Sequence, residues 1–325
     1  MGVQPKFVAP SSRAELVGYI HSKDAAAERL FCKTCGCHVG DEDLVADPTT
    51  GEVEWRVATS NFDDHSEKTF RIGAHYFTSA APGGGLYDWL PTMGERKVGS
   101  WSPPAGSKDF PIPRADPPKQ EFDAQGREVL RAECHCGGVS FTIPRPNRPE
   151  STQSKFIQQY ISPLDSNKWL AVLDTCDDCR LVNGTHVIPW TFIPLAQTEP
   201  RIPQDLKFGT LVTYQSSPTV QRAFCGVCGA TVFFTCEERT DPSGKETVVD
   251  LSVGILRAPE GPNAENWLTW RTGRLAWHES GKRFDPVFAD SLAKGFDAWG
   301  RERYGESPGF SIGESTWAST AADAE

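Results

Sequence analysis

The chain has no long apolar segment and no excess of basic residues. None of its 325 residues belong to a continuous apolar run of about 18, the length that a membrane-spanning helix requires. Residues 1–18 contain no apolar core of signal-peptide length. With 33 Lys and Arg against 43 Asp and Glu, the net charge is −10, which disfavours binding to nucleic acid or to an acidic membrane. We therefore expect a cytoplasmic protein with neither partner.

The composition also disfavours long helices. The 29 Gly and 25 Pro interrupt helices frequently, while 10 Trp and 18 Phe favour strands. This combination excludes a coiled coil or a helical repeat and indicates an all-β protein with many short strands and turns.

Ten cysteines carry the most specific information in the sequence. Three pairs have the spacing Cys-x-x-Cys, where random placement would give roughly 0.3. A disulfide framework and redox-active dithiols are the alternatives to metal binding. The first is disfavoured in a reducing compartment, and the second lacks the βαβ setting of thioredoxin-like motifs. Thiolate ligands favour zinc.

One zinc site is predicted from two turns that lie about ninety residues apart in the sequence. Each turn contains a cysteine pair, is followed by glycine and leads into an apolar strand, over residues 139–143 and 230–234. Two such turns supply the four thiolates of a structural zinc site. The predicted ligands are Cys134, Cys136, Cys225 and Cys228.

A second site is predicted around the remaining central pair, Cys176 and Cys179. Asp174 would be its third ligand, leaving a fourth position for water or substrate, as in catalytic zinc sites. The alternative is that Asp174 is a turn residue or a helix N-cap. Arg180 would bind the carboxylate of a substrate, or else pair with a local aspartate.

Three segments resemble the family of the glutathione-dependent formaldehyde-activating enzyme and centromere protein V. They are CHCGGVSF (134–141), CDDCRLVNG (176–184) and YQSS followed by RAFCGVCG (214–217 and 222–229), in the family's order. The resemblance covers roughly residues 129–256. It implies a β-tent fold of small antiparallel sheets, a structural zinc on the outer four cysteines and a second zinc on the central motif. It also implies glutathione as a cosubstrate.

The chain departs from the family pattern at one ligand, because Asp174 stands where the family has the first cysteine of its central motif. A carboxylate is a harder ligand than a thiolate and changes the Lewis acidity of zinc. We hypothesise a zinc-dependent carbon–sulfur lyase-like enzyme that acts on a small carbonyl compound or its thiol adduct. Such an enzyme could also be repurposed for a lyase, dehydratase or cyclisation step on a larger metabolite. Asp174, Cys176, Cys179 and Arg180 would be its catalytic residues. The alternative is a non-catalytic, zinc-stabilised interaction module, and the sequence leaves this choice open.

The N-terminal part repeats one half of the same pattern. RLFCKTCG (29–36) corresponds to residues 222–229, but no equivalent of the first or central motif precedes it. Cys32 and Cys35 are predicted to bind a further zinc, with Cys37 and His38 as crowded candidates for completing the site. Because half a module does not close its own sheet easily, we expect it to pack against the complete module or against a second chain.

The predicted organisation is therefore tandem. It comprises a degenerate half-module (1–102), a Pro-rich linker (103–120), a complete module with a C-terminal helix (121–305) and a disordered tail (306–325). Two helices are expected, a short one over residues 23–29 and an amphipathic one over residues 288–304, where Phe288, Leu292, Phe296 and Trp299 share a face.

Overall fold

The described residues form mainly antiparallel β-sheets, with 30% in strands and 22% in helices, so the fold is mainly β and richer in helix than the predicted all-β protein with two helices. This description rests on a computed structural model of the chain and covers residues 6–63, 65, 68–104 and 117–312. Most of the predicted linker and of the predicted tail lies outside the described residues. No helix in the described part of the chain combines the length and the apolar character needed to cross a bilayer.

The N-terminal sheet is built from four consecutive antiparallel strands. They are β1 (Leu16–Tyr19), β2 (Ala27–Cys32), β3 (His38–Asp43) and β4 (Trp55–Val57). The helix predicted over residues 23–29 is wrong, because most of that segment is a turn and the start of β2. Pairing with β1 aligns Arg29 with Tyr19 and lets Leu30 and Phe31 become buried, which outweighs local helix propensity.

Two small strand pairs and a short helix follow the N-terminal sheet. Strand β5 (Ala74–Tyr76) runs parallel to β8 (Gly99–Trp101), and β6 (Thr92–Met93) pairs with β7 (Arg96–Lys97). Helix α1 (Leu86–Trp89) lies between β5 and β6 in the sequence. Trp89 is buried in the core of the C-terminal part, with its ring 4.7 Å from that of Trp270.

The C-terminal part contains one large sheet and one small one. The large sheet has the order β14 (Leu211–Ser217), β15 (Val220–Cys225), β16 (Thr231–Cys236), β17 (Val248–Ser252), β13 (Ile188–Pro194), β12 (Trp169–Asp174) and β18 (Leu268–Trp270). Only the β12–β18 pair is parallel in this sheet. The small sheet has the order β11 (Ser140–Pro144), β10 (Glu128–Glu133) and β9 (Glu121–Phe122).

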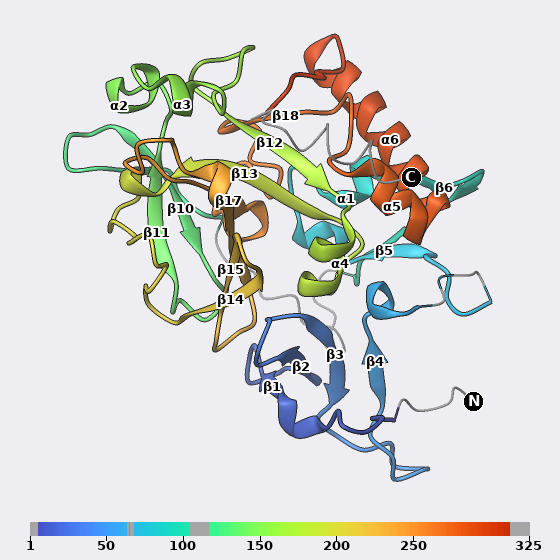
Figure 1. Cartoon of the computed structure of the whole chain (residues 1–325). Helices are drawn as coiled ribbons and strands as arrows, with labels where there is room; N and C mark the ends of the chain where they lie inside the picture. The colour runs from blue at the N-terminus through green and yellow to red at the C-terminus, as the bar shows by residue number, and fades with distance from the viewer. Residues whose placement is uncertain (1–5, 64, 66–67, 105–116, 313–325) are drawn as a thin grey trace.

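The helices lie at the edges of these sheets (Figure 1). They are α2 (Pro149–Thr152), α3 (Lys155–Gln158), α4 (Asp177–Asn183), α5 (His278–Phe284) and α6 (Pro286–Tyr304). Helix α6 confirms the prediction over residues 288–304. Asp285 caps its first turn by accepting from the Phe288 N–H at 2.9 Å, and Gly305 ends it in the left-handed conformation. Its four predicted apolar residues are buried.

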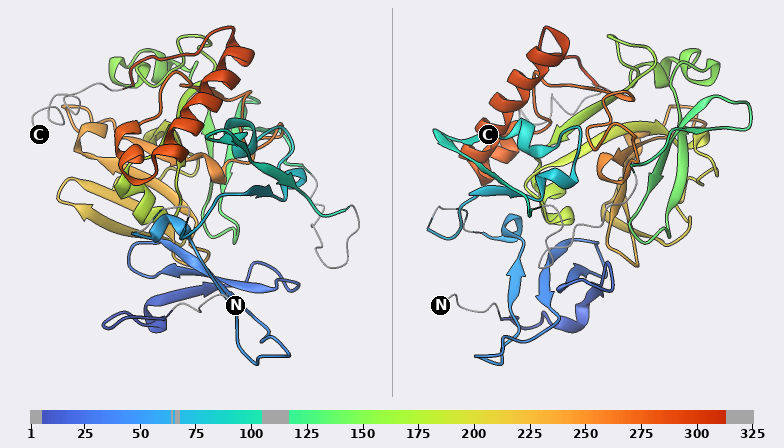
Figure 2. Two further views of the ribbon diagram at one scale, coloured as in Figure 1. Left: turned by 90° about the vertical axis from the view of Figure 1, so that its right-hand side faces the viewer. Right: turned by 180° about the vertical axis from the view of Figure 1, so that it is seen from behind.

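The N-terminal sheet lies against the C-terminal part of the chain, one of the two placements expected for it (Figures 1 and 2). The contact involves two turns of the same Cys-x-x-Cys-Gly sequence. A Cβ atom on Gly229 would lie 2.6 Å from the Phe31 ring, and one on Gly36 would collide with Phe224. The two phenylalanine rings meet edge to face, with 6.2 Å between their centroids. Each turn therefore places its glycine against the phenylalanine that precedes the other turn.

We predict that Gly229→Ala weakens this contact, and Gly137→Ala provides the matched control. Both glycines directly follow a cysteine of the four-cysteine cluster and have φ near +73°, but a Cβ on Gly137 would have nothing within 4 Å. Backbone strain alone should cost either variant about 1–2 kcal/mol of unfolding free energy. Overpacking against Phe31 should cost Gly229→Ala about 1–3 kcal/mol more, measured by urea unfolding. Equal losses in the two variants would contradict the contact.

Candidate metal centres

The four cysteines of the first predicted site come together in the structure. Cys134 and Cys136 lie in the turn between β10 and β11, while Cys225 ends β15 and Cys228 lies in the turn after it. Their sulfur atoms all lie within 4.8 Å of one another. The Cys134–Cys136 and Cys136–Cys225 sulfur distances are 3.6 and 3.4 Å. A tetrahedral zinc with Zn–S bonds of about 2.3 Å would separate its sulfurs by about 3.8 Å, so this cluster can hold a metal ion with little rearrangement.

Backbone N–H groups point at these sulfurs and prepare them for a cation. Cys134 Sγ accepts from the Val139 N–H at 3.3 Å, and Cys225 Sγ accepts from the Cys228 N–H at 3.5 Å. The hydrogen bond from the Cys228 thiol is the main reason that the pKa of Cys225 falls to about 4, whereas burial raises that of Cys134 to about 11. A bound dication would displace the remaining thiol protons.

All ten cysteines are free, so the structure contains none of the disulfides considered as an alternative.

The N-terminal sheet contributes a tyrosine to the edge of this cluster. The Tyr19 hydroxyl lies 2.7 Å from Nδ1 of His135, the residue between Cys134 and Cys136. Burial and the four nearby thiolates together raise the pKa of Tyr19, Cys228 being the first of these thiolates in effect. His135 is thus held by a neighbour, and sequence reasoning missed Tyr19 as part of this environment. The only sequence feature that indicated a role for Tyr19 is the likeness of YIHS (19–22) to YQSS (214–217) in the C-terminal part.

Asp174, Cys176 and Cys179 also come together, in a second group whose ligand atoms lie within 4.8 Å of one another. Asp174 ends β12, and Cys176 is the N-cap of α4, its sulfur accepting from the Cys179 N–H at 3.3 Å. The Asp174 Oδ1 atom accepts from the Cys176 N–H at 2.8 Å. The turn function considered for Asp174 therefore exists, and the same bond orients its carboxylate toward the two sulfurs.

A buried arginine faces this second group. Arg222 in β15 is only 5% exposed and donates from Nη1 to Cys179 Sγ at 3.6 Å and from Nε to Ser216 Oγ at 3.2 Å. Burial disfavours its charge, but the hydrogen bond to Cys179 and the combined attraction of Cys179, Cys176 and Asp178 outweigh this and raise the pKa of Arg222. Although Arg222 lies within the quoted motif, its spacing alone gave no reason to assign it to the central cysteines.

Charge in this second group is costly without a cation. Burial raises the pKa of Asp174 to about 6. The hydrogen bond with Cys179 and burial raise the pKa of Cys176 far above its usual range. Three anionic ligands and one guanidinium leave a surplus of two negative charges, which a divalent cation would balance.

Arg180 has a structural position, which matches the alternative of a local pairing. Its Nε and Nη2 atoms donate to Asp177 Oδ1 at 3.3 Å, and Nη1 donates to the Ser60 carbonyl. The guanidinium stacks on Phe284 at 3.7 Å from the ring centroid, and the side chain is 11% exposed. These contacts tie α4 to the segment after β4 and leave Arg180 poorly placed to recognise a substrate.

The predicted zinc site at Cys32 and Cys35 lacks a ligand set in the structure. Within the described residues, no third Cys, His, Asp or Glu ligand atom joins this pair to form a compact group. Cys37 is buried and directs its sulfur to Asn61 Oδ1 at 3.5 Å. The chain therefore brings together seven of the ten residues predicted as ligands or catalytic groups, in two groups that could each hold a metal ion.

The N-terminal sheet also closes the space beside the second group. A Cβ on Gly184, which ends α4, would collide with the His38 carbonyl, and His186 Nε2 lies 3.1 Å from Thr59 Oγ1. A cavity of about 10 Å³ lies at this junction, with Cys35, Asn183 and Arg222 among its lining residues. It has room for about one water molecule.

No protein-family model matches this chain, and none of the curated proteins or solved structures matches it either. The motifs and the geometry of the two cysteine groups are therefore the features of the chain that indicate its function.

We predict that Asp174→Asn stabilises the metal-free protein at neutral pH. Burial raises the pKa of Asp174 from 3.8 to about 6, so the folded state holds this proton more tightly than the unfolded state. The protonated Asp174 carboxyl therefore contributes to the free energy of unfolding in full below pH 4, and this contribution is lost as the pH rises through 6. Asparagine keeps the Oδ1 acceptor for the Cys176 N–H but carries no charge.

The chelator-treated Asp174→Asn protein should therefore exceed the wild type by up to about 3 kcal/mol at pH 7 and match it at pH 4, measured by urea unfolding. The exposed neighbour Asp178 provides the control substitution Asp178→Asn. If the difference between wild type and Asp174→Asn is the same at both pH values, Asp174 is not a buried charge in the folded protein.

Proposed function

We propose that this chain is a zinc protein with the β-tent fold of the formaldehyde-activating enzyme and centromere protein V family, and that its second zinc supports lyase-like chemistry. The observation that carries the proposal is the convergence of Asp174, Cys176 and Cys179 beside Arg222. Three protein ligands are the number typical of catalytic zinc, which keeps its fourth position for water or substrate. The four-cysteine centre fits a closed, structural zinc.

The donor chemistry of the second group suits zinc, since two thiolates and one carboxylate are all common zinc ligands. A zinc ion held there would polarise a carbonyl oxygen or lower the pKa of a water or thiol at its open position. Asp174, Cys176 and Cys179 would hold the ion, and the Asp174 carboxylate would keep its orientation through the Cys176 N–H. With the ion bound, the net charge of ligands and metal is −1, which Arg222 balances.

The proposed substrate is a small carbonyl compound or its thiol adduct, including an adduct of glutathione. Arg222 would act as a positioning residue, because its bond to Cys179 fixes one thiolate and withdraws charge from it. Arg180 is not part of this proposal as a substrate ligand, since each of its three nitrogens already donates to Asp177 or Ser60 and its guanidinium is stacked on Phe284.

A second candidate is a non-catalytic module in which both metal ions only stabilise the fold. The specific observation in its favour is the cavity of about 10 Å³ beside Arg222 and Cys35, which is too small for a glutathione adduct. In the lyase proposal, the N-terminal sheet must move away from α4 to admit substrate. In this second candidate, it stays in place.

We predict two zinc equivalents per wild-type chain and one in a Cys176→Ser/Cys179→Ser double variant, measured by elemental analysis of the purified proteins. Serine removes the thiolates but leaves the four-cysteine centre intact. Cys236→Ser is the matched control, because Cys236 is buried and belongs to neither metal group. Unchanged zinc content in the double variant would refute a metal at the second centre.

The same proteins decide between the two functions when they are assayed with formaldehyde, other small aldehydes and their glutathione adducts. Lyase-like function requires turnover by the wild type and by Cys236→Ser, and a loss of at least about a hundredfold in the double variant. Two zinc equivalents without turnover of any of these compounds would support the non-catalytic module.

A further inference from the structure

A polar cleft lies at the two ends of the segment 144–166, which follows β11 and contains helices α2 and α3. Its volume is about 580 Å³, within the range of small-molecule sites. Every lining residue is polar, and none is a cysteine of the two metal groups. Arginines and asparagines predominate: Arg127, Arg145, Arg148, Asn147, Asn167 and Asn266. Because these residues come from several separate segments, the folded chain is needed to assemble the cleft.

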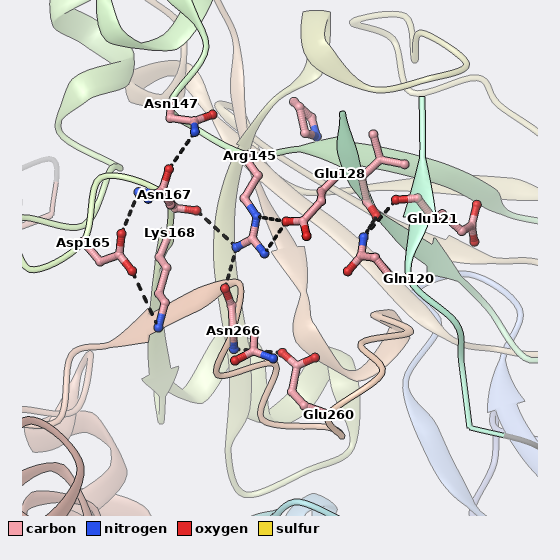
Figure 3. A network of polar contacts seen from close by, with 12 residues as sticks. Gln120, Glu121, Glu128, Arg145, Asn147, Asp165, Asn167, Lys168, Glu260 and Asn266 are labelled. Atoms are coloured by element: carbon pink, nitrogen blue, oxygen red, sulfur yellow. Dashed lines mark hydrogen bonds and ion pairs between the residues drawn. The ribbon is translucent and has the colours of Figure 1, made fainter. Parts of the chain in front are cut away.

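Arg145 holds the wall of this cleft in place (Figure 3). Its guanidinium lies 3.8 Å from the ring centroid of the buried Trp267 and donates from Nε to Glu128 at 2.9 Å. Its Nη1 atom donates to the carbonyl oxygens of Asn167 and Asn266. Arg145 therefore joins three segments, and its own donors are used within the protein.

Amide groups in the cleft are likewise positioned by the fold. Asn147 Nδ2 donates to Asn167 Oδ1 at 2.6 Å, and the Asn167 N–H donates to Asp165 Oδ1 at 2.9 Å (Figure 3). Such fixed amides suit a ligand that carries hydroxyl or carbonyl groups, because preorganised partners lose little entropy on binding.

Arg148 differs from Arg145 because part of its guanidinium is unused. Its side chain is 17% exposed, and its hydrogen bonds, to Asp123 Oδ2 and the Glu128 carbonyl, both come from Nη2. Among the described residues, neither Nε nor Nη1 of Arg148 has a hydrogen-bond partner. Neither is one of the polar atoms that are fully buried without a partner, so both are accessible to solvent. These two nitrogens are donors that solvent or a ligand can reach.

Arg148 also shares its ion-pair partner, Asp123, with Arg127, and Glu150 is the other carboxylate that attracts it. Arg127 donates to the same Asp123 Oδ2 atom, at 2.9 Å, so one carboxylate serves two guanidinium groups. Burial and the repulsion from Arg127 lower the pKa of Arg148. An anion at the free nitrogens would relieve this repulsion and accept charge-assisted hydrogen bonds.

We propose that the cleft binds a small, polyhydroxylated metabolite that carries a phosphate or carboxylate group. The free donors of Arg148 bind the anionic group, and the amides of Asn147 and Asn167 bind its hydroxyl or carbonyl groups. This site is independent of the proposed zinc chemistry, since no cysteine lines it.

The test is isothermal titration of the zinc-loaded full chain with glucose 6-phosphate, gluconate and glucose, which separate phosphate, carboxylate and neutral ligands. We expect glucose 6-phosphate or gluconate to bind at least tenfold more tightly than glucose. Arg148→Gln should weaken that binding at least tenfold, and Asn147→Leu should weaken it severalfold. The exposed Arg201 lies outside the cleft, and Arg201→Gln, which changes net charge equally, should bind like the wild type.

Folding of each variant is checked by circular dichroism, and Asp123 retains Arg127 as a partner when Arg148 is replaced. The proposal is overturned if neither anionic probe binds the wild type. It is also overturned if Arg148→Gln and Arg201→Gln weaken binding equally, because that indicates only general charge attraction. If Arg148→Gln does not fold, unchanged binding by Asn147→Leu overturns it. The Cys176→Ser/Cys179→Ser protein should bind like the wild type whether or not the zinc proposal holds.

Discussion

The reciprocal contact of two Cys-x-x-Cys-Gly turns determines how the rest of this structure is arranged. Each turn ends in a left-handed glycine that has no side chain, and the phenylalanine before the other turn fills the space. This contact fixes the N-terminal sheet on the complete module. Tyr19 consequently reaches His135 beside the four-cysteine cluster, and His38 reaches Gly184 at the end of α4. The N-terminal sheet therefore forms part of the environment of both candidate metal sites.

The second constraint is electrostatic. The structure places a carboxylate, two thiols and a guanidinium in a poorly solvated space, where each unbalanced charge is expensive. Arg222 offsets one charge, and the rest must be neutralised by protons or by a cation. Burial raises the pKa of Asp174 for the same reason, because a proton removes the unbalanced charge of its carboxylate. Binding of a metal ion to this group would therefore release protons.

Local sequence patterns predicted those features that local patterns control. Helix α6 has an N-cap, a proline in its first turn, a terminal glycine and four apolar residues with helical spacing. All four features favour a helix over the same residues. The four-cysteine cluster followed from turn spacing, because the two turns each present two sulfurs. The helix predicted over residues 23–29 was wrong because this segment leads into β2, and the pairing of β2 with β1 does not follow from any local sequence pattern.

The contacts of single arginines could not be predicted for a related reason. Arg180 and Arg222 lie near the same cysteines. The sequence drew attention only to Arg180, which follows Cys179, either as a ligand of a substrate carboxylate or as the partner of a local aspartate. In the structure, Arg180 turns toward Asp177 and Phe284, whereas Arg222 reaches Cys179 across the fold from β15. Which guanidinium reaches the sulfur depends on strand register and on the direction of each side chain, and these require the tertiary structure.

The Phe31–Phe224 contact has a consequence for the time course of synthesis. The two residues are separated by 193 positions in the chain. At about 5–20 residues per second, the ribosome needs roughly 10–40 s to make the second partner after the first. During that interval, Phe31 and the open sheet around it have no partner surface, and Cys134 and Cys136 have no opposing cysteine pair. The N-terminal sheet of the nascent chain must therefore stay soluble without its docking surface, which is complete only when the last thiolates of the four-cysteine cluster emerge.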